Sequence, residues 1–503
     1  MSAATSDSKK PDWHARAREI TIDGRAWING ERVDAASGAT FDKHSPVDGR
    51  RLAAVARGEA VDIDRAVAAG RAAFEDGRWS RKAPAARKRI LQRWSELITA
   101  ARDELALLET LDMGKPIQYA LSVDVPATAR TIAWYGEAID KVYDEIAPTG
   151  SNALALITRE AMGVIGCIVP WNYPMIMAAW KLGPALATGN SVVMKPSEKS
   201  PLTALKLAEL AVQAGIPPGV FNVVPGYGHE AGEALALHMD VDAIGFTGST
   251  RTGRRMLDYA SRSNLKRVWN ELGGKSAFLV FPDHHDPALA ARTVAGAMYF
   301  NQGESCNAPS RVLVHASIAD DFVAVLREEA PKYRPGDPLD ASTVMGALVD
   351  DGQLRTVMGY IASGKAEGAR CISGGEQVRT DSGGPYVEPT LFDGVTPQMK
   401  IAREEIFGPV LSVLRFESEA EAIALANGTD YGLQASVWSH DINRAHRVAR
   451  ALRAGTVHVN QYDEDDITVP FGGHRQSGNG RDKSLHALEK YTELKTTWLR
   501  IDR

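Results

Sequence analysis

One cysteine lies in a segment whose composition suits a nucleophile better than a buried side chain. The stretch FNQGESCNAPSR, residues 300–311, surrounds Cys306 with polar residues and a glycine, and it has no apolar periodicity. A cysteine usually behaves as a small buried hydrophobe, whereas a reactive thiolate needs polar, partly exposed surroundings. The segment therefore predicts a nucleophilic thiol, and the alternative is an incidental free cysteine in a loop.

Two further side chains capable of catalysis follow predicted strands. Asn172, in PWNYP after the run GVIGCIV, offers an amide N–H that could stabilise a developing oxyanion. Glu271, in ELGG after the run RVW, offers a carboxylate on flexible backbone, which suits proton transfer. The alternatives are an asparagine that stabilises its own turn and a glutamate in a capping or surface role.

Two other strand ends have features that suit a dinucleotide. Glu198, in KPSE after the run SVVM, could accept hydrogen bonds from ribose hydroxyls. Residues 247–253, TGSTRTG, open a predicted helix whose N-terminal N–H groups could bind a phosphate. The glycine spacing differs from G-x-G-x-x-G, so a capped tight turn and a surface carboxylate remain the alternatives.

The elements that position these segments predict an α/β fold with two domains. Residues 160–280 alternate short β-branched runs with helical patterns, which is typical of a parallel sheet covered by helices. Such sheets bind ligands at the carboxyl ends of their strands, where the segments above lie. A second alternating block follows Cys306 and predicts a second α/β domain. Apolar residues spaced from 90 to 108 predict one helix ending near 114–116, and residues 489–501 predict an exposed strand.

Length and composition exclude several classes of protein. A chain of 503 residues exceeds the size of a single hydrophobic core, so at least two domains are expected. The net charge of −5 argues against a nucleic-acid-binding surface. Three widely spaced cysteines predict neither a disulfide framework nor a metal site. No apolar run could span a membrane and the first residues lack the apolar core of a signal peptide, so a cytoplasmic protein is expected.

Seven motifs occur along the chain in one order: VPWNYP, KPSE, FTGST, ELGG, FNQGESC, EEIFGPV and PFGGHRQSGNGR. Together they resemble the aldehyde dehydrogenase superfamily over roughly residues 20 to 500. The resemblance implies a Rossmann-like cofactor domain plus an α/β catalytic domain and a β-strand oligomerisation arm. The implied boundaries are 1–138 and 162–274 for the NAD-binding domain, 275–476 for the catalytic domain, and 139–161 with 477–503 for the arm. A homodimer or homotetramer is implied as well.

The resemblance also implies a reaction, the NAD⁺-dependent oxidation of an aldehyde to a carboxylic acid, with NADP⁺ as a second acceptable cofactor. Cys306 would form a thiohemiacetal and then a thioester, while Asn172 and the Cys306 N–H stabilise the oxyanion. Glu271 would activate the hydrolytic water, which favours hydrolysis over acyl transfer to coenzyme A. Lys181 and Asp482 match a proposed proton-relay pair.

Further positions match the parts of the family that hold cofactor and substrate. The implied cofactor-binding residues are Trp171, Lys195, Ser197, Glu198, Thr247, Gly248, Ser249, Gly253, Leu272, Glu405 and Phe407. Glu198 favours NAD⁺, because a carboxylate repels the 2′-phosphate of NADP⁺. The positions that match the aldehyde tunnel are Tyr173, Met177, Trp180 and Phe300.

The tail SGNGRDKSLHALEKYTELKTTW resembles the bacterial branch that oxidises ω-aminoaldehydes such as γ-glutamyl-γ-aminobutyraldehyde and 4-guanidinobutyraldehyde. This branch implies a role in polyamine or arginine breakdown. The acids of the segment before PFGG, Asp463, Glu464, Asp465 and Asp466, could attract an ammonium or guanidinium group. The alternatives are a solvated acidic loop, a broad aliphatic aldehyde dehydrogenase for detoxification, or a non-catalytic NAD-binding structural protein.

Overall fold

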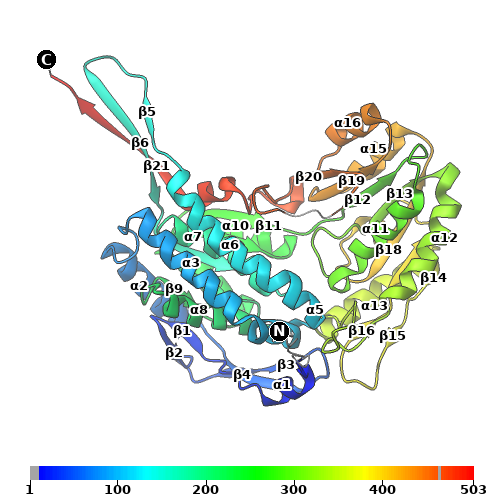
Figure 1. The fold of residues 1–503 in the computed structure, drawn as a ribbon, viewed down its shortest axis with the longest axis horizontal. Coiled ribbons are helices and arrows are strands. Elements are labelled where there is room, and N and C mark those ends of the chain that lie inside the picture. The colour runs from blue at the N-terminus through cyan, green and yellow to red at the C-terminus, as the bar shows by residue number, and fades with distance from the viewer. Residues whose placement is uncertain (1–10, 463–465, 503) are drawn as a thin grey trace, which may run out of the picture.

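Two seven-stranded sheets form the two main bodies of the molecule (Figure 1). The computed structural model describes residues 11–462 and 466–502. The first sheet has the order β11-β10-β7-β8-β9-β1-β2; strands β7 to β11 run parallel to one another, whereas β1 pairs antiparallel with both β9 and β2. The strands are β1 (Ala26–Ile28), β2 (Glu31–Val33), β7 (Val164–Ile168), β8 (Ser191–Lys195), β9 (Phe221–Val223), β10 (Ala243–Thr247) and β11 (Arg267–Glu271).

Helices cover both faces of this sheet, as the alternating pattern predicts. Ile165 and Val192 face one apolar cluster, together with side chains of α3, α6, α7 and α8. Val164 and Val193 face the opposite cluster, together with side chains of α2, α9 and α10. The helices are α2 (Ala60–Glu75), α3 (Pro84–Ala100), α6 (Val125–Ala138), α7 (Pro174–Ala187), α8 (Leu202–Ala214), α9 (Glu233–Leu237) and α10 (Thr250–Ser261). Both faces of a buried parallel sheet are apolar, which explains the β-branched runs.

The helix predicted from residue 84 to about 114 is in fact two helices. α3 ends at Ala100, and α4 (Arg102–Met113) begins after Ala101, whose φ of −87° and ψ of 17° break the helical path. α4 then ends at Gly114, which has a left-handed φ of 88°. The apolar spacing continues across the break, so periodicity alone could not reveal it.

The second sheet has the order β14-β17-β18-β13-β12-β19-β20, and every neighbouring pair except β14–β17 is parallel. Its strands are β12 (Ala277–Val280), β13 (Arg311–His315), β14 (Arg370–Ser373), β17 (Thr390–Asp393), β18 (Val410–Phe416), β19 (Gln434–Trp438) and β20 (Thr456–Val459). The accompanying helices are α11 (Pro287–Tyr299), α12 (Ala319–Glu329), α13 (Asp351–Ala366), α14 (Lys400–Arg403), α15 (Glu419–Asn427) and α16 (Ile442–Ala451). The second α/β block predicted after Cys306 corresponds to this sheet, but the block begins earlier than predicted, because β12 and α11 precede Cys306.

A third sheet, β21-β6-β5, extends away from both bodies, and the C-terminus lies near its tip (Figure 1). β21 (Thr492–Arg500) pairs antiparallel with β6 (Ala153–Ala161) along its whole length, and β5 (Glu145–Ala147) lies on the other side of β6. The exposed strand predicted near the C-terminus is confirmed as β21. We call this sheet the arm.

Shorter elements lie between these sheets and helices. They include α1 (Trp13–Glu19), the hairpin β3 (Thr40–His44) and β4 (Arg51–Ala56), α5 (Ile117–Tyr119), the π-helical turn η1 (Ala120–Asp124), and the pair β15 (Gln377–Val378) and β16 (Tyr386–Val387). No helix within residues 11–462 and 466–502 combines the length and apolar character needed to cross a bilayer.

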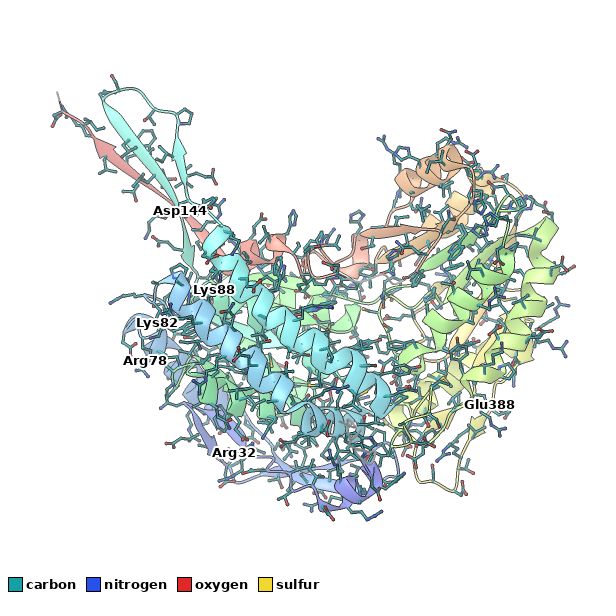
Figure 2. The ribbon with its side chains drawn as sticks, in the orientation of Figure 1. Arg32, Arg78, Lys82, Lys88, Asp144 and Glu388 are labelled. Atoms are coloured by element: carbon teal, nitrogen blue, oxygen red, sulfur yellow. The ribbon has the colours of Figure 1, made fainter. Side chains whose placement is uncertain are left out.

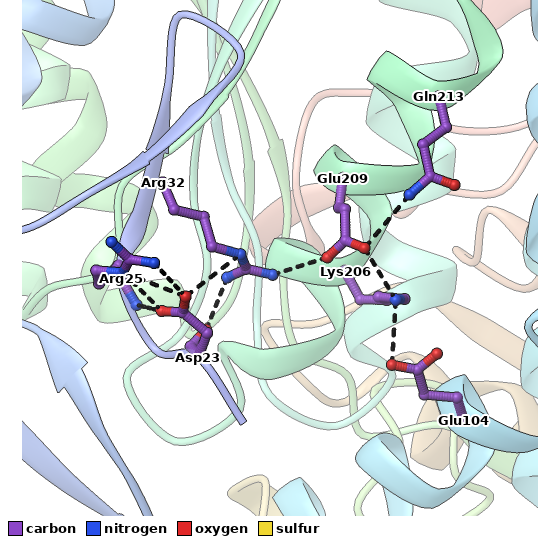
Figure 3. A network of polar contacts seen from close by, with 7 residues as sticks. All are labelled: Asp23, Arg25, Arg32, Glu104, Lys206, Glu209 and Gln213. Carbon is purple, nitrogen blue, oxygen red and sulfur yellow. Dashed lines mark hydrogen bonds and ion pairs between the residues drawn. The ribbon is translucent and has the colours of Figure 1, made fainter. Parts of the chain in front are cut away.

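Ion pairs fasten the edge of the first sheet to its covering helices (Figure 3). Arg32 of β2 lies 2.9 Å from the carboxylate of Glu209 on α8. Lys206, one turn earlier on α8, lies 3.1 Å from both Glu209 and Glu104 of α4. The chain of alternating charges therefore joins β2, α8 and α4, three segments that are far apart in the sequence.

Candidate active site

A cavity of about 920 Å³ lies between the first and second sheets, and both contribute to its wall. Its volume is near the upper end of the range for small-molecule sites, roughly 300–1,000 Å³. From the first body come the segments after β7, β10 and β11, which are carboxyl ends of parallel strands. From the second body come the end of α11, the Cys306 loop and the segment around Glu405. The cavity therefore lies where the sheet topology predicts ligand binding.

Strained backbone leads into the nucleophile loop. Asn301, Gln302 and Gly303 have φ values of 50°, 58° and 69°, so three successive residues adopt the left-handed conformation. A Cβ on Gly303 would lie 2.5 Å from the carbonyl of Gly408, so only glycine fits there. Such conformations cost about 1–3 kcal/mol for each non-glycine residue and gather at functional sites. Here they bring the half-buried Cys306 into the cavity wall.

The Asn172 side chain is fixed against the same loop. Its Nδ2 donates a hydrogen bond of 2.9 Å to the carbonyl oxygen of Glu304, and its backbone carbonyl accepts one of 3.0 Å from the side chain of Asn301. An amide nitrogen has two N–H groups, and the contact with Glu304 uses one. The second can serve an oxyanion formed at Cys306, two residues along the loop.

Glu304 is a buried residue of this loop that the sequence reasoning did not select. Its Oε1 accepts a hydrogen bond of 3.1 Å from the backbone N–H of Val349, and burial raises the pKa of its carboxyl well above the usual range. The backbone carbonyl oxygen of Glu304 also accepts the hydrogen bond from Asn172 Nδ2. Glu304 therefore connects the second body to the predicted oxyanion donor. The residues that contact Glu304 come from distant parts of the sequence, so no local sequence pattern identifies it as part of the site.

Glu271, at the end of β11, lines the cavity and is 3% exposed. Within the described part of the chain, neither of its carboxylate oxygens has a hydrogen-bond partner. Burial raises the pKa of Glu271 well above its usual range, and the negative charge of Asp482 raises it further. A desolvated carboxylate of this kind is a stronger base than an exposed one.

Lys181 of α7 and Asp482, the predicted relay pair, meet behind the cavity wall. The Nζ of Lys181 lies 2.5 Å from Oδ2 of Asp482, and both side chains are 1% exposed. Lys490, which the sequence reasoning missed, contacts the other carboxylate oxygen. Burial alone would raise the pKa of Asp482, but the two ammonium groups lower it below its usual value. The charges of Asp482, Lys181 and Lys490 all act on Glu271, although none of the three lines the cavity.

Three of the residues predicted to bind the cofactor, Glu405, Phe407 and Trp171, converge on the cavity. Glu405 accepts a hydrogen bond of 3.0 Å from the N–H of Gly274, and burial raises its pKa to about 7. Phe407, at a left-handed φ of 58°, packs edge-on against Trp171 with ring centroids 5.1 Å apart. Gln353 of α13, which was not predicted, donates a hydrogen bond of 2.7 Å to the carbonyl of Phe407.

Other predicted cofactor residues form a polar cradle at the carboxyl end of β10. The hydroxyl of Thr247 is buried and has no hydrogen-bond partner among residues 11–462 and 466–502, and Gly248 and Ser249 line the cavity beside it. Ser249 caps α10, and a Cβ on Gly253 would lie 2.6 Å from Leu272. An orphaned hydroxyl at a capped helix N-terminus suits an anionic, hydroxyl-rich ligand such as a dinucleotide.

Lys195, Ser197 and Glu198 lie outside the cavity lining. Lys195 and Ser197 are buried, and the Nζ of Lys195 lies 3.2 Å from the carboxylate of Glu198. These three residues therefore lie apart from the cavity that Glu405 and Phe407 line.

The substrate residues predicted from the sequence fall into two groups. Tyr173, Met177, Trp180 and Phe300 line the cavity, as does Asp466. Asp463, Glu464 and Asp465 lie outside the described residues. Two further lining residues, Phe471 and Lys483, were not predicted as substrate contacts.

Comparison with known proteins finds relatives along nearly the whole chain. A profile of the aldehyde dehydrogenase family matches residues 33–497. The NADP/NAD-dependent aldehyde dehydrogenase PuuC of Escherichia coli (strain K12) is 53% identical over 490 residues, 97% of this chain and 98% of the relative. A solved indole-3-acetaldehyde dehydrogenase complexed with NAD⁺ is 59% identical, with a TM-score of 0.97 over 97% of this chain and 99% of that one. A gamma-glutamyl-gamma-aminobutyraldehyde dehydrogenase of Burkholderia cenocepacia J2315 is 56% identical, with a TM-score of 0.96 over 98% and 99%.

Proposed function

The chain belongs to the aldehyde dehydrogenase family, and we propose that its substrates are amino- or guanidino-aldehydes. It is an NAD(P)-dependent enzyme that oxidises aldehydes. The proposed catalytic site rests on one observation, that Cys306, Asn172 and Glu271 all line the same cavity. The substrate class is supported by Asp466 in the wall of that cavity and by the similarity to a gamma-glutamyl-gamma-aminobutyraldehyde dehydrogenase.

We assign the first chemical step to Cys306. Its sulfur forms a bond to the aldehyde carbon, and the carbonyl π electrons move to the oxygen, which becomes an oxyanion. The Nδ2 of Asn172, already anchored by the carbonyl of Glu304, donates a hydrogen bond to this oxygen together with the Cys306 N–H. The donors are rigid before the reaction begins, so little reorganisation is needed as charge develops.

When bound, NAD⁺ supplies the hydride acceptor for the oxidation. Glu405, Phe407, Trp171 and the cradle after β10 are the residues that we assign to its nicotinamide and phosphate parts. The oxidised acyl group then remains on Cys306 as a thioester. Glu271 removes a proton from a water molecule that attacks the thioester carbon, and the carbon–sulfur bond breaks to release the carboxylic acid.

We assign Lys181 and Asp482 to the removal of the proton that Glu271 accepts, with Lys490 as a third member. These side chains form a buried chain of charges whose fields act on Glu271. Lys195, Ser197 and Glu198 are assigned to the adenosine side of the cofactor, and Gly253 belongs to the cradle after β10. NAD⁺ is the proposed preference because Glu198 is a carboxylate.

A second candidate substrate class is a neutral, apolar aldehyde. The cavity wall carries the aromatic rings of Trp180, Phe300 and Phe471, and the indole-3-acetaldehyde dehydrogenase is as similar in fold as the amino-aldehyde enzyme. Such a wall would accept aldehydes of several kinds, as a detoxifying enzyme requires.

The two classes are separated by NADH formation with aldehydes of equal length. The assay compares 4-aminobutyraldehyde and 4-guanidinobutyraldehyde with a neutral four-carbon aldehyde. A tenfold or greater advantage in kcat/KM for the cationic aldehydes, about 1.4 kcal/mol of transition-state preference, supports the proposal. An equal or higher value for the neutral aldehyde rejects it in favour of the broad enzyme.

We also propose the domain division given above, assembly as a homodimer or homotetramer through the arm, and a cytoplasmic location in polyamine or arginine breakdown. The boundary near residue 274 falls between β11 and β12, which belong to different sheets. The arm presents large apolar side chains to solvent. The three cysteines are free thiols, as expected in a reducing compartment.

A further inference from the structure

An ion pair joins the first body to the second, although neither of its residues lines the cavity. Lys199, in the segment between β8 and α8, places its Nζ 2.7 Å from Oδ2 of Asp350, the residue before α13. Burial alone would raise the pKa of Asp350, but the hydrogen bond and the charge of Lys199 lower it below its usual value. An isolated pair that is partly exposed to solvent contributes little to stability, so the role of this pair depends on what else its two residues contact.

Lys199 also contacts the wall of the cavity. Its Nζ lies 5.3 Å from the ring centre of Trp171, within the range of a cation–π interaction. Trp171 in turn packs edge-on against Phe407, with ring centroids 5.1 Å apart, and both rings line the cavity. A single ammonium group therefore holds the Asp350 carboxylate and the indole of Trp171 at the same time.

The other oxygen of the Asp350 carboxylate provides a second connection to Phe407. Oδ1 accepts a hydrogen bond of 2.8 Å from the N–H of Gln353 and so caps α13. The side-chain amide of Gln353 donates hydrogen bonds of 3.2 and 2.7 Å to the carbonyls of Ile406 and Phe407. Phe407 has a φ of 58°, a strained conformation that persists only where neighbouring contacts enforce it. The capped first turn of α13 supplies such contacts.

The start of α13 is connected to the nucleophile loop as well. The N–H of Val349, the residue before Asp350, donates a hydrogen bond of 3.1 Å to Oε1 of Glu304. The carbonyl of Glu304 fixes the side chain of Asn172, the proposed oxyanion donor. The ion pair therefore lies where contacts from the proposed cofactor residues and contacts from the nucleophile loop meet.

We propose that Lys199 and Asp350 form a positioning pair that holds the rings of Trp171 and Phe407 against the nicotinamide end of the cofactor. This role rests on the proposed function, which assigns both rings to the nicotinamide. Hydride transfer is sensitive to such placement, because a displacement of about 1 Å can cost about a hundredfold in rate. Loss of the pair should therefore affect the use of the cofactor more than aldehyde binding or thioester hydrolysis.

The test compares two single variants that remove opposite charges. Lys199→Met keeps the aliphatic part of the side chain, and Asp350→Asn keeps a residue that caps α13 equally well. A long-range effect of charge on the anionic cofactor would have opposite signs in the two variants, whereas lost positioning has the same sign in both. The double variant should be no worse than the single variants, because all of them remove the same interaction.

Isothermal titration calorimetry measures binding without turnover. Both single variants should raise the Kd for NAD⁺ by about fivefold, whereas the Kd for ADP-ribose, which lacks the nicotinamide, should stay within about twofold. With saturating NAD⁺, stopped-flow measurement should show an NADH burst slowed by about tenfold. The burst should also show a larger isotope effect when the aldehyde carries deuterium on its carbonyl carbon. KM for the aldehyde should change by less than about threefold.

Lys88→Met is the matched control. Lys88 of α3 lies 3.2 Å from Asp140, and the two side chains are 28% and 34% exposed, compared with 29% and 38% for Lys199 and Asp350. Lys88 lies on the first body, away from the second sheet (Figure 2), so its loss should change neither the Kd nor the burst. Lys199→Arg keeps the charge and the cation–π contact and should behave like the wild type. If Lys199→Met does not fold, Lys199→Gln replaces it.

The proposal is overturned if Lys199→Met weakens NAD⁺ and ADP-ribose equally, because Lys199 would then act at the adenosine or phosphate end of the cofactor. It is also overturned if the two single variants change the Kd for NAD⁺ in opposite directions, or if both fold and match the wild type. Failure of the proposed function has a different signature, since Phe407→Ala would then leave the Kd for NAD⁺ and the burst unchanged. A change caused by Lys199→Met in that situation would reject the positioning role as well.

Discussion

At the scale of single residues, the reaction depends on groups held ready before the substrate arrives. The Asn172 side chain is fixed by its hydrogen bond to the carbonyl of Glu304. Glu271 is buried away from solvent, and the charge of Asp482 is balanced by the ammonium groups of two lysines. Each contact joins residues more than a hundred positions apart, except that between Asp482 and Lys490. Such arrangements make the effect of one substitution specific to one chemical step.

Asn172→Ala is expected to lower kcat by about 10²–10³, the usual effect of losing one oxyanion donor. KM for the aldehyde should change far less, because the lost hydrogen bond forms only when the oxyanion does. Steady-state kinetics measures both constants. Asn152→Ala, an exposed position on the turn before β6, is the control and should match wild type. A mutant that raised KM while keeping kcat would contradict the assignment.

Glu271→Gln is expected to slow hydrolysis of the thioester, by about 10²–10⁴ as for loss of a general base. One equivalent of NADH should then form quickly on each active site, followed by slow turnover. In the wild type the carboxylate is the active form and its pKa is raised by burial, so activity should increase as the pH rises through that raised pKa. The mutant should lack this rise. A pH profile of kcat that is identical in both enzymes would disprove the role.

At the scale of elements, local patterns predict the strands and covering helices well, because a strand buried on both faces leaves an uninterrupted apolar run. Asn172, Glu271 and Thr247 could be selected for the same reason, since each follows such a strand. Gln353, Lys490 and Glu304 could not, because their partners come from distant elements and nothing nearby in the sequence marks them. The helix break at Ala101, between α3 and α4, could not be predicted because the apolar spacing continues across it.

α4 carries a buried carboxyl group that makes stability depend on pH. Glu109 is fully buried, and burial raises its pKa well above the usual range; Asp124 raises it further and Lys115 opposes both. The folded protein therefore retains a proton that the unfolded chain releases above about pH 4.3, so this group makes stability fall as the pH rises from there toward the raised pKa.

Glu109→Gln should remove that dependence, because glutamine does not titrate and has nearly the same shape. The melting temperature of the variant should exceed that of the wild type at pH 8 by roughly 2–4 °C, the shift expected for about 1 kcal/mol in a domain of this size. At pH 5 the two should be closer together. Thermal unfolding at both pH values measures the difference. A constant offset between the proteins would show that Glu109 acts by packing or hydrogen bonding alone.

At the scale of the whole molecule, the proposed mechanism requires both bodies, because Glu271 comes from the first and Cys306 from the second. The order of the motifs along the sequence predicts that they share one site, but only tertiary packing, in which Lys483 lies over Trp180 of α7, places Lys483 in the same cavity as Tyr173. The arm belongs to neither body. This position outside both bodies supports the proposal that the arm serves contacts between copies of the chain.

The arm supports a prediction about assembly. β21 is an edge strand, and Leu494 and Trp498 are 64% and 66% exposed on one of its faces. An exposed edge strand with large apolar side chains tends to pair with another chain. Among copies of one chain, such pairing commonly produces a closed symmetric oligomer. The double substitution Leu494→Thr with Trp498→Thr removes this apolar surface and keeps residues that suit a strand.

Light scattering coupled to size-exclusion chromatography should show a smaller assembly for the double variant than for wild type, increasingly so on dilution. The ladder between β21 and β6 uses backbone groups, so the fold of each copy should persist and its far-ultraviolet circular dichroism should not change. Thr497→Ser, on the opposite face of β21, should leave the mass unchanged. Since Cys306 and Glu271 lie in one chain, the separated copies should still bind NAD⁺. If the double variant and the wild type have equal masses, the interface lies elsewhere on the molecule.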